Sequence, residues 1–156
     1  MSPRFIFRPF VFATALSALM TIPAYAADMI TKISPHSVTI TMDRLAAAVE
    51  GAGATVFARV DHAAGAAKVE MELRPTELLI FGNPKLGTPA MLDGQTAGLD
   101  LPLRVLVFAD AEGVVQVTYH DPADLAETHG LPADAQYLAM MTGALDKLTA
   151  KAIAEE

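Results

Sequence analysis

Two segments of the chain carry apolar residues at the three- to four-residue spacing of an amphipathic helix. The first begins after Ser37, a favourable N-cap residue, and ends near Gly51. The second follows Asp134, which we expect to cap it, and its apolar side is formed by Tyr137, Met141, Leu145, Leu148 and Ala152. Shorter helices are predicted around residues 89–93 and over residues 122–129, the second ended by Gly130. Both long apolar stripes must face a core.

Alternation of apolar and polar residues, or a short apolar run, predicts the strands. They are residues 29–34, 55–61, 69–73, 78–81, 103–109 and 114–120. The run at 78–81 is continuously apolar, as expected for a central strand covered on both faces. Residues 63–68 read as an alanine-rich turn and 82–88 as a loop. Asp110 and Gly113 suit the first and fourth positions of a type I turn, which makes 103–120 the clearest hairpin.

The connections between neighbouring strands are too short for the crossovers that a doubly wound parallel sheet needs. Helices and strands are nevertheless interspersed. We therefore expect an α+β fold in two layers, with a mostly antiparallel or mixed sheet of about five strands and helices packed on it.

The amino terminus has the three-part layout of a secretory signal peptide. Arg4 and Arg8 precede the apolar run 10–20, and the small-residue triplet 24–26 offers a cleavage site. A spanning helix needs about 20 apolar residues, which this run does not reach, so we expect no retained membrane anchor. The sequence predicts cleavage of residues 1–26, leaving one exported domain, 27–156, in the periplasm or outside the cell.

Charge and cysteine content narrow the possible partners of this mature domain. Without Arg4 and Arg8, 9 basic residues remain of 11, against 18 acidic ones, so the formal charge becomes −9. Nucleic acid is a poor partner for such a surface, because binding relies on Lys and Arg contacts to phosphate. The chain has no cysteine, which excludes disulfides and a lipidated cysteine. Stability must come from the core.

Five blocks in the chain carry a resemblance that spans most of the mature domain. They are Thr55–His62 (TVFARVDH), Leu73–Pro84 (LRPTELLIFGNP), Gly87–Pro89 (GTP), Asp100–Arg104 (DLPLR) and Tyr119–Pro122 (YHDP). In this order they resemble the domain of unknown function 302 family. The resemblance implies a small two-layer domain that is often a homodimer and has no established activity. Family members commonly carry Asn after the tyrosine, where this chain has His120.

The segment 82–88 is the first candidate binding region, with Asn83, Lys85 and Thr88 as its polar side chains. A phosphate loop would need Lys directly after the second glycine, where Thr88 stands instead. Backbone N–H groups at the following helix could bind a carboxylate or other small anion, helped by Lys85. The alternative is that the glycines only permit a tight strand-to-helix connection.

Strand ends supply the remaining candidates. Asp61 and His62 form one pair, in which imidazole could bind metal or transfer protons, or Asp61 could simply cap the next turn. The others are Arg74, Asp100, Arg104, Tyr119 and His120. The arginines could line an anionic pocket, or Arg104 could pair internally with Asp100. His62 and His120 could share a metal or haem site only if their strand ends meet, and no His-x-x-x-His or cysteine cluster supports one.

These observations leave three hypotheses for function, with the cofactor unknown. The first is an exported module that binds a small ligand, an anion, metal or haem, or acts as a dimeric scaffold. The second is an enzyme with His62 or His120 as general acid or base. The third is self-association through an apolar sheet face. A serine or cysteine hydrolase is disfavoured, because Ser34 and Ser37 are the only mature serines and no Gly-x-Ser-x-Gly occurs.

Overall fold

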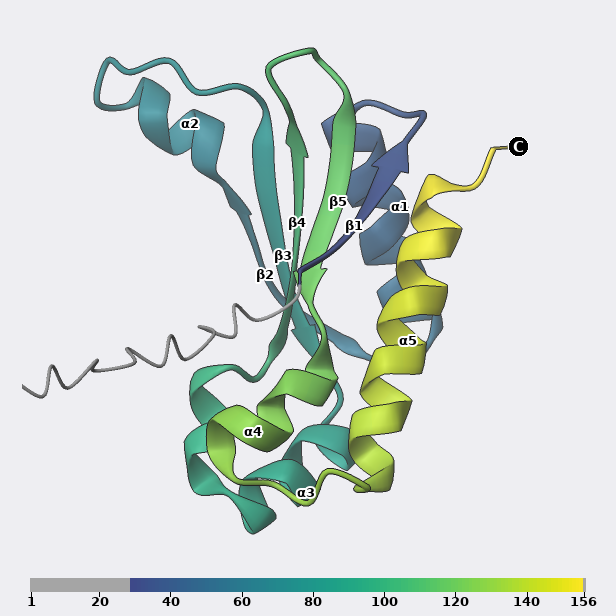
Figure 1. Ribbon diagram of the computed structural model, residues 1–156. Helices are drawn as coiled ribbons and strands as arrows, with labels where there is room; N and C mark the ends of the chain where they lie inside the picture. The colour runs from purple at the N-terminus through teal and green to yellow at the C-terminus, as the bar shows by residue number, and fades with distance from the viewer. Residues whose placement is uncertain (1–28, 156) are drawn as a thin grey trace, which may run out of the picture.

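Five strands form one antiparallel sheet in a computed structural model that describes residues 29–155, so the predicted signal peptide lies outside the described residues. The order across the sheet is β1-β5-β4-β3-β2 (Figure 1). The strands are β1 Met29–Ser34, β2 Thr55–Asp61, β3 Thr76–Gly82, β4 Leu103–Ala109 and β5 Val115–His120. With helices packed on this sheet, the predicted α+β class is confirmed.

Two long helices cover one face of the sheet and leave the other face open (Figure 1). They are α1 Val38–Gly51 and α5 Gln136–Ile153. The shorter elements are α2 His62–Ala67, α3 Pro84–Asp93, η1 Gln95–Leu99, η2 Pro122–Asp124 and α4 Leu125–His129. No helix among residues 29–155 has the length and apolar character needed to cross a membrane.

The main core lies between the sheet and these two helices. From β3, β4 and β5 it takes alternate residues, because successive side chains of a strand point to opposite faces. They are Leu79, Phe81, Val105, Val107, Val117 and Tyr119, all buried. A second, smaller core joins α3, η1 and α4 to the first turns of α5. Thus the short helices form a separate packed layer at one end of the sheet.

Charged residues on the covered face of the sheet pair with the helices. Lys32 on β1 lies 2.7 Å from Asp146 of α5 and also donates to Thr149. Arg59 on β2 bridges Glu77 on β3 and Asp43 on α1, each at 2.5 Å. The hydrogen bond to Glu77 raises the pKa of Arg59 above its ordinary value, although partial desolvation of the guanidinium opposes this rise. These pairs join the edge strands to the helical layer.

Several turn and cap predictions are confirmed. Ser37 accepts from the N–H of Ile40 at the start of α1. Gly130 takes φ 67° after α4, in the left-handed region that favours glycine. Asp110 closes the β4–β5 hairpin by accepting from the N–H groups of Glu112 and Val114. Desolvation opposes ionisation of Asp110, but these bonds and one from Gln116 lower its pKa overall.

The segment 62–75 differs from its prediction. The expected alanine-rich turn is the helix α2, in keeping with alanine being the best helix former. The expected strand 69–73 is irregular. Met71 N–H bonds to the carbonyl of Ala66, and Glu70 takes φ 59°, the arrangement that ends a helix with a left-handed residue. This helix ending occupies the first half of the predicted strand.

Three further expectations are corrected. The predicted loop 82–88 is mostly the first half of α3, which Asn83 caps and Pro84 starts, so the helix is longer than the expected 89–93. β3 is covered on one face only, since Leu79 is buried and Leu78 half-exposed. Asp134 does not cap α5: Ala135 precedes its first residue without a side-chain bond.

Candidate functional site

The predicted site residues divide between the two ends of the sheet. Asp61, at the carboxyl end of β2, lies opposite Glu77, where β3 begins. His120, at the carboxyl end of β5, lies opposite Met29, where β1 begins. Because all neighbours are antiparallel, His62 and His120 fall at opposite ends, which carry α2 and α3 respectively (Figure 1). A metal or haem site shared by His62 and His120 required their strand ends to meet, and these strand ends lie at opposite ends of the sheet.

At the α2 end, the candidate residues make local structural contacts. Asp61 accepts from the N–H of Ala64 at 2.8 Å and so caps α2, the alternative predicted for it. His62 is the exposed first residue of that helix. Arg74 donates to the carbonyl of Ala109 at 3.0 Å. Within residues 29–155 no three His, Cys, Asp or Glu side chains gather as a metal site would require.

At the α3 end, the backbone donors expected to bind an anion already have partners. The side-chain oxygen of Asn83 accepts a hydrogen bond from the N–H of Lys85. The backbone carbonyl of Asn83 accepts from the N–H groups of Leu86 and Gly87. Pro84 has no N–H to offer. Lys85 and Thr88 are both exposed. The N–H groups at the start of α3 therefore bond to Asn83, and the residues that suggested an anion site instead form the cap of this helix.

The same segment nevertheless lines a cavity of about 420 Å³. Its walls come from β2, the start of α3, the chain before β4, and α5. Apolar side chains dominate them: Phe57, Leu86, Met91, Leu101, Leu103 and Met141. Asn83 and Thr88 are the two side chains with hydrogen-bonding groups in this lining. A mostly apolar cleft of this size with a few polar groups is typical of small-molecule sites.

A smaller cavity of about 250 Å³ lies beside it, and more of its lining side chains are polar or charged. Asp100, Arg104, His120, Asp121 and Asp124 line it. Arg104 donates to Asp100 at 2.8 Å, which is the internal pair predicted as an alternative to ligand binding. Asp121 accepts from Thr142 and from its own helix start. Asp100, Arg104 and Asp121 are thus engaged within the fold, whereas the Oδ2 atom of Asp124 is buried without a hydrogen-bond partner among the described residues.

Tyr119 is not available to a ligand at either cavity. It is 4% exposed and belongs to the main core, on the covered face of the sheet. The adjacent His120 points to the opposite face and is exposed, because neighbouring strand residues alternate. Of the resemblance block Tyr119–Pro122, His120, Asp121 and Pro122 therefore line the smaller cavity, and Tyr119 does not.

Sequence reasoning missed two features near the cavities. His129, whose side chain is 5% exposed, bridges Asp100 at 2.8 Å and Thr96 at 3.1 Å, and so ties α4 to η1. Tyr137 on α5 donates to Asp93 of α3 at 2.8 Å, and burial with this bond raises the pKa of Tyr137 to about 12. Neither pairing has a sequence signal, since the partners lie more than 25 positions apart.

Part of several longer proteins is similar in sequence to this domain. The chain is 50% identical over 117 residues to proteins named fluoride-specific ion channel FluC 1 from Brucella suis and Brucella abortus. That alignment covers 74% of this chain but 46% and 43% of those proteins, so the chain spans less than half the length of the curated relatives it matches. The channel activity in their names is stated for those longer proteins.

The fold and the family agree. The crystal structure of an uncharacterized conserved protein from Bacillus stearothermophilus superposes with a TM-score of 0.73 at 17% identity, covering 81% of this chain and 99% of that one. At that identity the likeness shows the fold. A family model matches residues 30–148, which include all five strands, although Met29 precedes the match. The chain therefore belongs to the family described as domain of unknown function DUF302.

Proposed function

We propose that the mature chain is an exported module that binds a small, largely apolar molecule in the 420 Å³ cavity beside α3. One observation carries this proposal: six apolar side chains from four parts of the chain converge on one cleft with two polar side chains among them. Burying apolar ligand surface is worth about 25 cal/mol per Å². Asn83 and Thr88 would orient a polar group of the ligand.

The ligand class differs from the anion expected from sequence. An anion needs free donors or cations, but the N–H groups at the start of α3 bond to Asn83. Lys85 is the one cationic side chain in residues 82–88. It is exposed and does not line the cavity. The walls instead favour an aliphatic or aromatic group.

A glycine in the wall allows the cavity to be filled without disturbing the fold. A Cβ at Gly87 would lie 3.9 Å from Leu101, an ordinary contact across the cavity wall. Gly87→Leu should therefore occupy the cavity while favouring the helix. Gly143→Leu is the matched control, since Gly143 also lies in a helix, has nothing within 4 Å of its Cβ position and does not line the cavity.

The test uses the uncharged fluorophore N-phenyl-1-naphthylamine with the mature domain. Wild type and Gly143→Leu should enhance its fluorescence saturably, and Gly87→Leu should weaken binding at least tenfold. Native mass spectrometry of protein purified from its export compartment should show a co-purifying small molecule that Gly87→Leu loses. Equal binding by the two glycine variants would place the probe elsewhere and refute the proposal.

Export itself rests on the sequence layout of residues 1–26. Cell fractionation followed by intact-mass measurement should find the protein outside the cytoplasm, beginning at Ala27. A cytoplasmic protein that still carries residues 1–26 would refute export.

A second candidate function follows from the relatives. Because a segment 50% identical to this chain is part of proteins named fluoride channels, we propose that this domain assists a fluoride channel made as a separate chain. Deleting the gene should lower the fluoride concentration that the cells tolerate, and the intact gene should restore it, with chloride as the control salt. The effect should vanish in cells that lack the channel. Unchanged tolerance after deletion would refute this role.

A further inference from the structure

The smaller cavity contains a carboxylate that the fold itself does not use. Asp124 lines this cavity, and its Oδ2 atom is buried without a hydrogen-bond partner among residues 29–155. Asp124 stands directly before α4, where an aspartate side chain often accepts a bond from a helix N–H, yet it makes no such bond. A buried oxygen without a donor has lost its hydration uncompensated, and in folded proteins such an atom calls for an explanation, such as a bound ion or ligand.

The charged groups of this cavity leave a negative balance. Three aspartates, Asp100, Asp121 and Asp124, line it together with one arginine, Arg104. The charge of Arg104 is already balanced within the fold by Asp100, which also bonds His129. A cationic group is therefore the kind of ligand group that this cavity favours.

An organic ammonium group suits this cavity better than a metal ion. Among residues 29–155, no three His, Cys, Asp or Glu side chains gather as a metal would require. An ammonium group can use fewer protein partners, because each of its N–H bonds can go to a carboxylate, an imidazole or water. His120 lines the same cavity and in its neutral form can accept one of these bonds. Rotation of an aspartate carboxylate is soft and two-fold, so either oxygen of Asp124 can turn toward such a donor.

The two cavities meet along the same stretches of chain. Leu103 lines both of them, while Leu101 lines the larger cavity and Arg104 the smaller. On α5, Met141 lines the larger cavity and Leu145 the smaller, and these residues are about one helical turn, ~5.4 Å, apart along the axis. A short alkyl chain spans such a distance, so one molecule can occupy both cavities.

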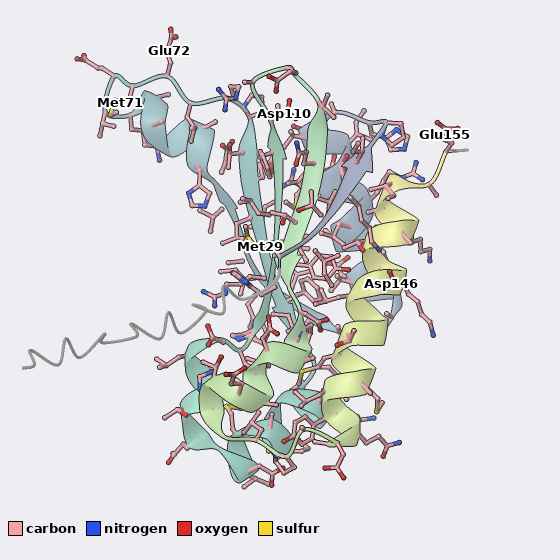
Figure 2. All side chains as sticks on the ribbon, in the orientation of Figure 1. Met29, Met71, Glu72, Asp110, Asp146 and Glu155 are labelled. Atoms are coloured by element: carbon pink, nitrogen blue, oxygen red, sulfur yellow. The ribbon has the colours of Figure 1, made fainter. Side chains whose placement is uncertain are left out.

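Both cavities lie at the end of the sheet that carries α3 and α4 (Figure 1). Met71 and Glu72 lie at the opposite end, next to α2 (Figure 2). At the α3 end, β5 finishes at His120, and the chain continues directly into η2, which ends at Asp124. The two groups that could hold an ammonium therefore follow the same strand.

We propose that the ligand is an amphiphilic amine, with its ammonium group held by Asp124 and His120 in the smaller cavity and its apolar part in the cavity beside α3. The inference rests on the proposed function for the apolar part and adds the charge of the ligand. Burial of the apolar part supplies affinity, which a neutral molecule of the same length shares. The charge-assisted hydrogen bond to Asp124 then selects the amine over the neutral molecule.

A pair of ligands that differ in charge tests this inference: 1-octylamine, which is protonated at neutral pH, and 1-octanol, which is neutral and of nearly the same length. In isothermal titration calorimetry with the mature domain, octylamine should bind about tenfold more tightly than octanol. Asp124→Asn keeps the shape of the side chain and removes its charge, so it should abolish this preference. The same variant should bind octanol as the wild type does, which also shows that it is folded.

Asp134→Asn is the matched control, since Asp134 is exposed, lines neither cavity and loses the same unit of charge. This variant should keep the preference for octylamine, which separates a local contact from the general attraction of a cation to an acidic protein. Gly87→Leu should weaken both ligands, because both need the apolar cavity.

The outcomes separate this inference from the proposed function. Equal binding of octylamine and octanol by the wild type would overturn the inference alone. So would a preference that Asp124→Asn keeps, or that Asp134→Asn loses to the same extent. Octanol binding that Gly87→Leu leaves unchanged would instead contradict the proposed function, and a wild type that binds neither molecule would contradict both.

Discussion

The two faces of the sheet have similar strand composition but different surroundings. On β3, Leu79 and Phe81 face α1 and α5 and are buried, whereas Leu78 and Ile80 face outward and stay half-exposed. The covered face even contains more charge, in Lys32, Arg59 and Glu77, each with a partner. Hydrophobicity of a strand residue therefore does not reveal which face the chain itself covers. On the face turned away from α1 and α5, Ile80 lies opposite Arg104 and Phe108 lies opposite Gln116, so apolar and polar side chains are mixed there.

The largest expected effect compares neighbouring leucines. Leu79→Ala should lower the free energy of unfolding by about 3 kcal/mol, because it leaves a cavity in the core. Leu78→Ala should cost about 1 kcal/mol or less in the monomer, since its side chain is already partly hydrated. Urea unfolding followed by circular dichroism at low protein concentration measures both. Equal losses would mean that the two faces are equally buried.

A smaller effect is expected from the charged residues of the covered face. Arg59→Leu should cost about 2 kcal/mol, because it removes the charged hydrogen-bond donor of Glu77, which is 7% exposed. Arg74→Leu is the control: Arg74 is exposed and bonds one backbone carbonyl, so its loss should stay within about 0.5 kcal/mol. The same urea titration compares them. A neutral Arg59→Leu would show that Glu77 rehydrates without its partner.

Local signals in the sequence predicted most of the fold. Ser37, Gly130 and the Asp110 turn act through hydrogen bonds or dihedral angles within a few residues, so their sequence patterns suffice. Residues 69–73 show the limit of such patterns. Their alternation predicts a strand, but the helix ending at Glu70 and the lack of a partner strand decide the outcome in this chain.

The candidate site was less predictable for the same reason. Asn83 and Thr88 were identified from a glycine-rich segment, and they do line a cavity, but the wall residues Met91 and Met141 come from other elements. His62 was grouped with His120 because both follow strands, and only the antiparallel register separates them. Chemistry that depends on residues from distant elements requires the three-dimensional arrangement.

The smallest effect concerns β1, where Lys32 faces the helices and the adjacent Ile33 faces the open side. A hydrogen bond from Lys32, together with its charge, lowers the pKa of Asp146. The stabilisation from ionised Asp146 should be complete above about pH 4, the usual range of a free aspartate, and be lost as pH falls through the lowered pKa. The difference in unfolding free energy between wild type and Asp146→Asn should therefore shrink on acidification. In a Lys32→Met background that pH dependence should disappear. A difference unaltered between neutral and acidic pH would show that Lys32 and Asp146 do not couple β1 to α5.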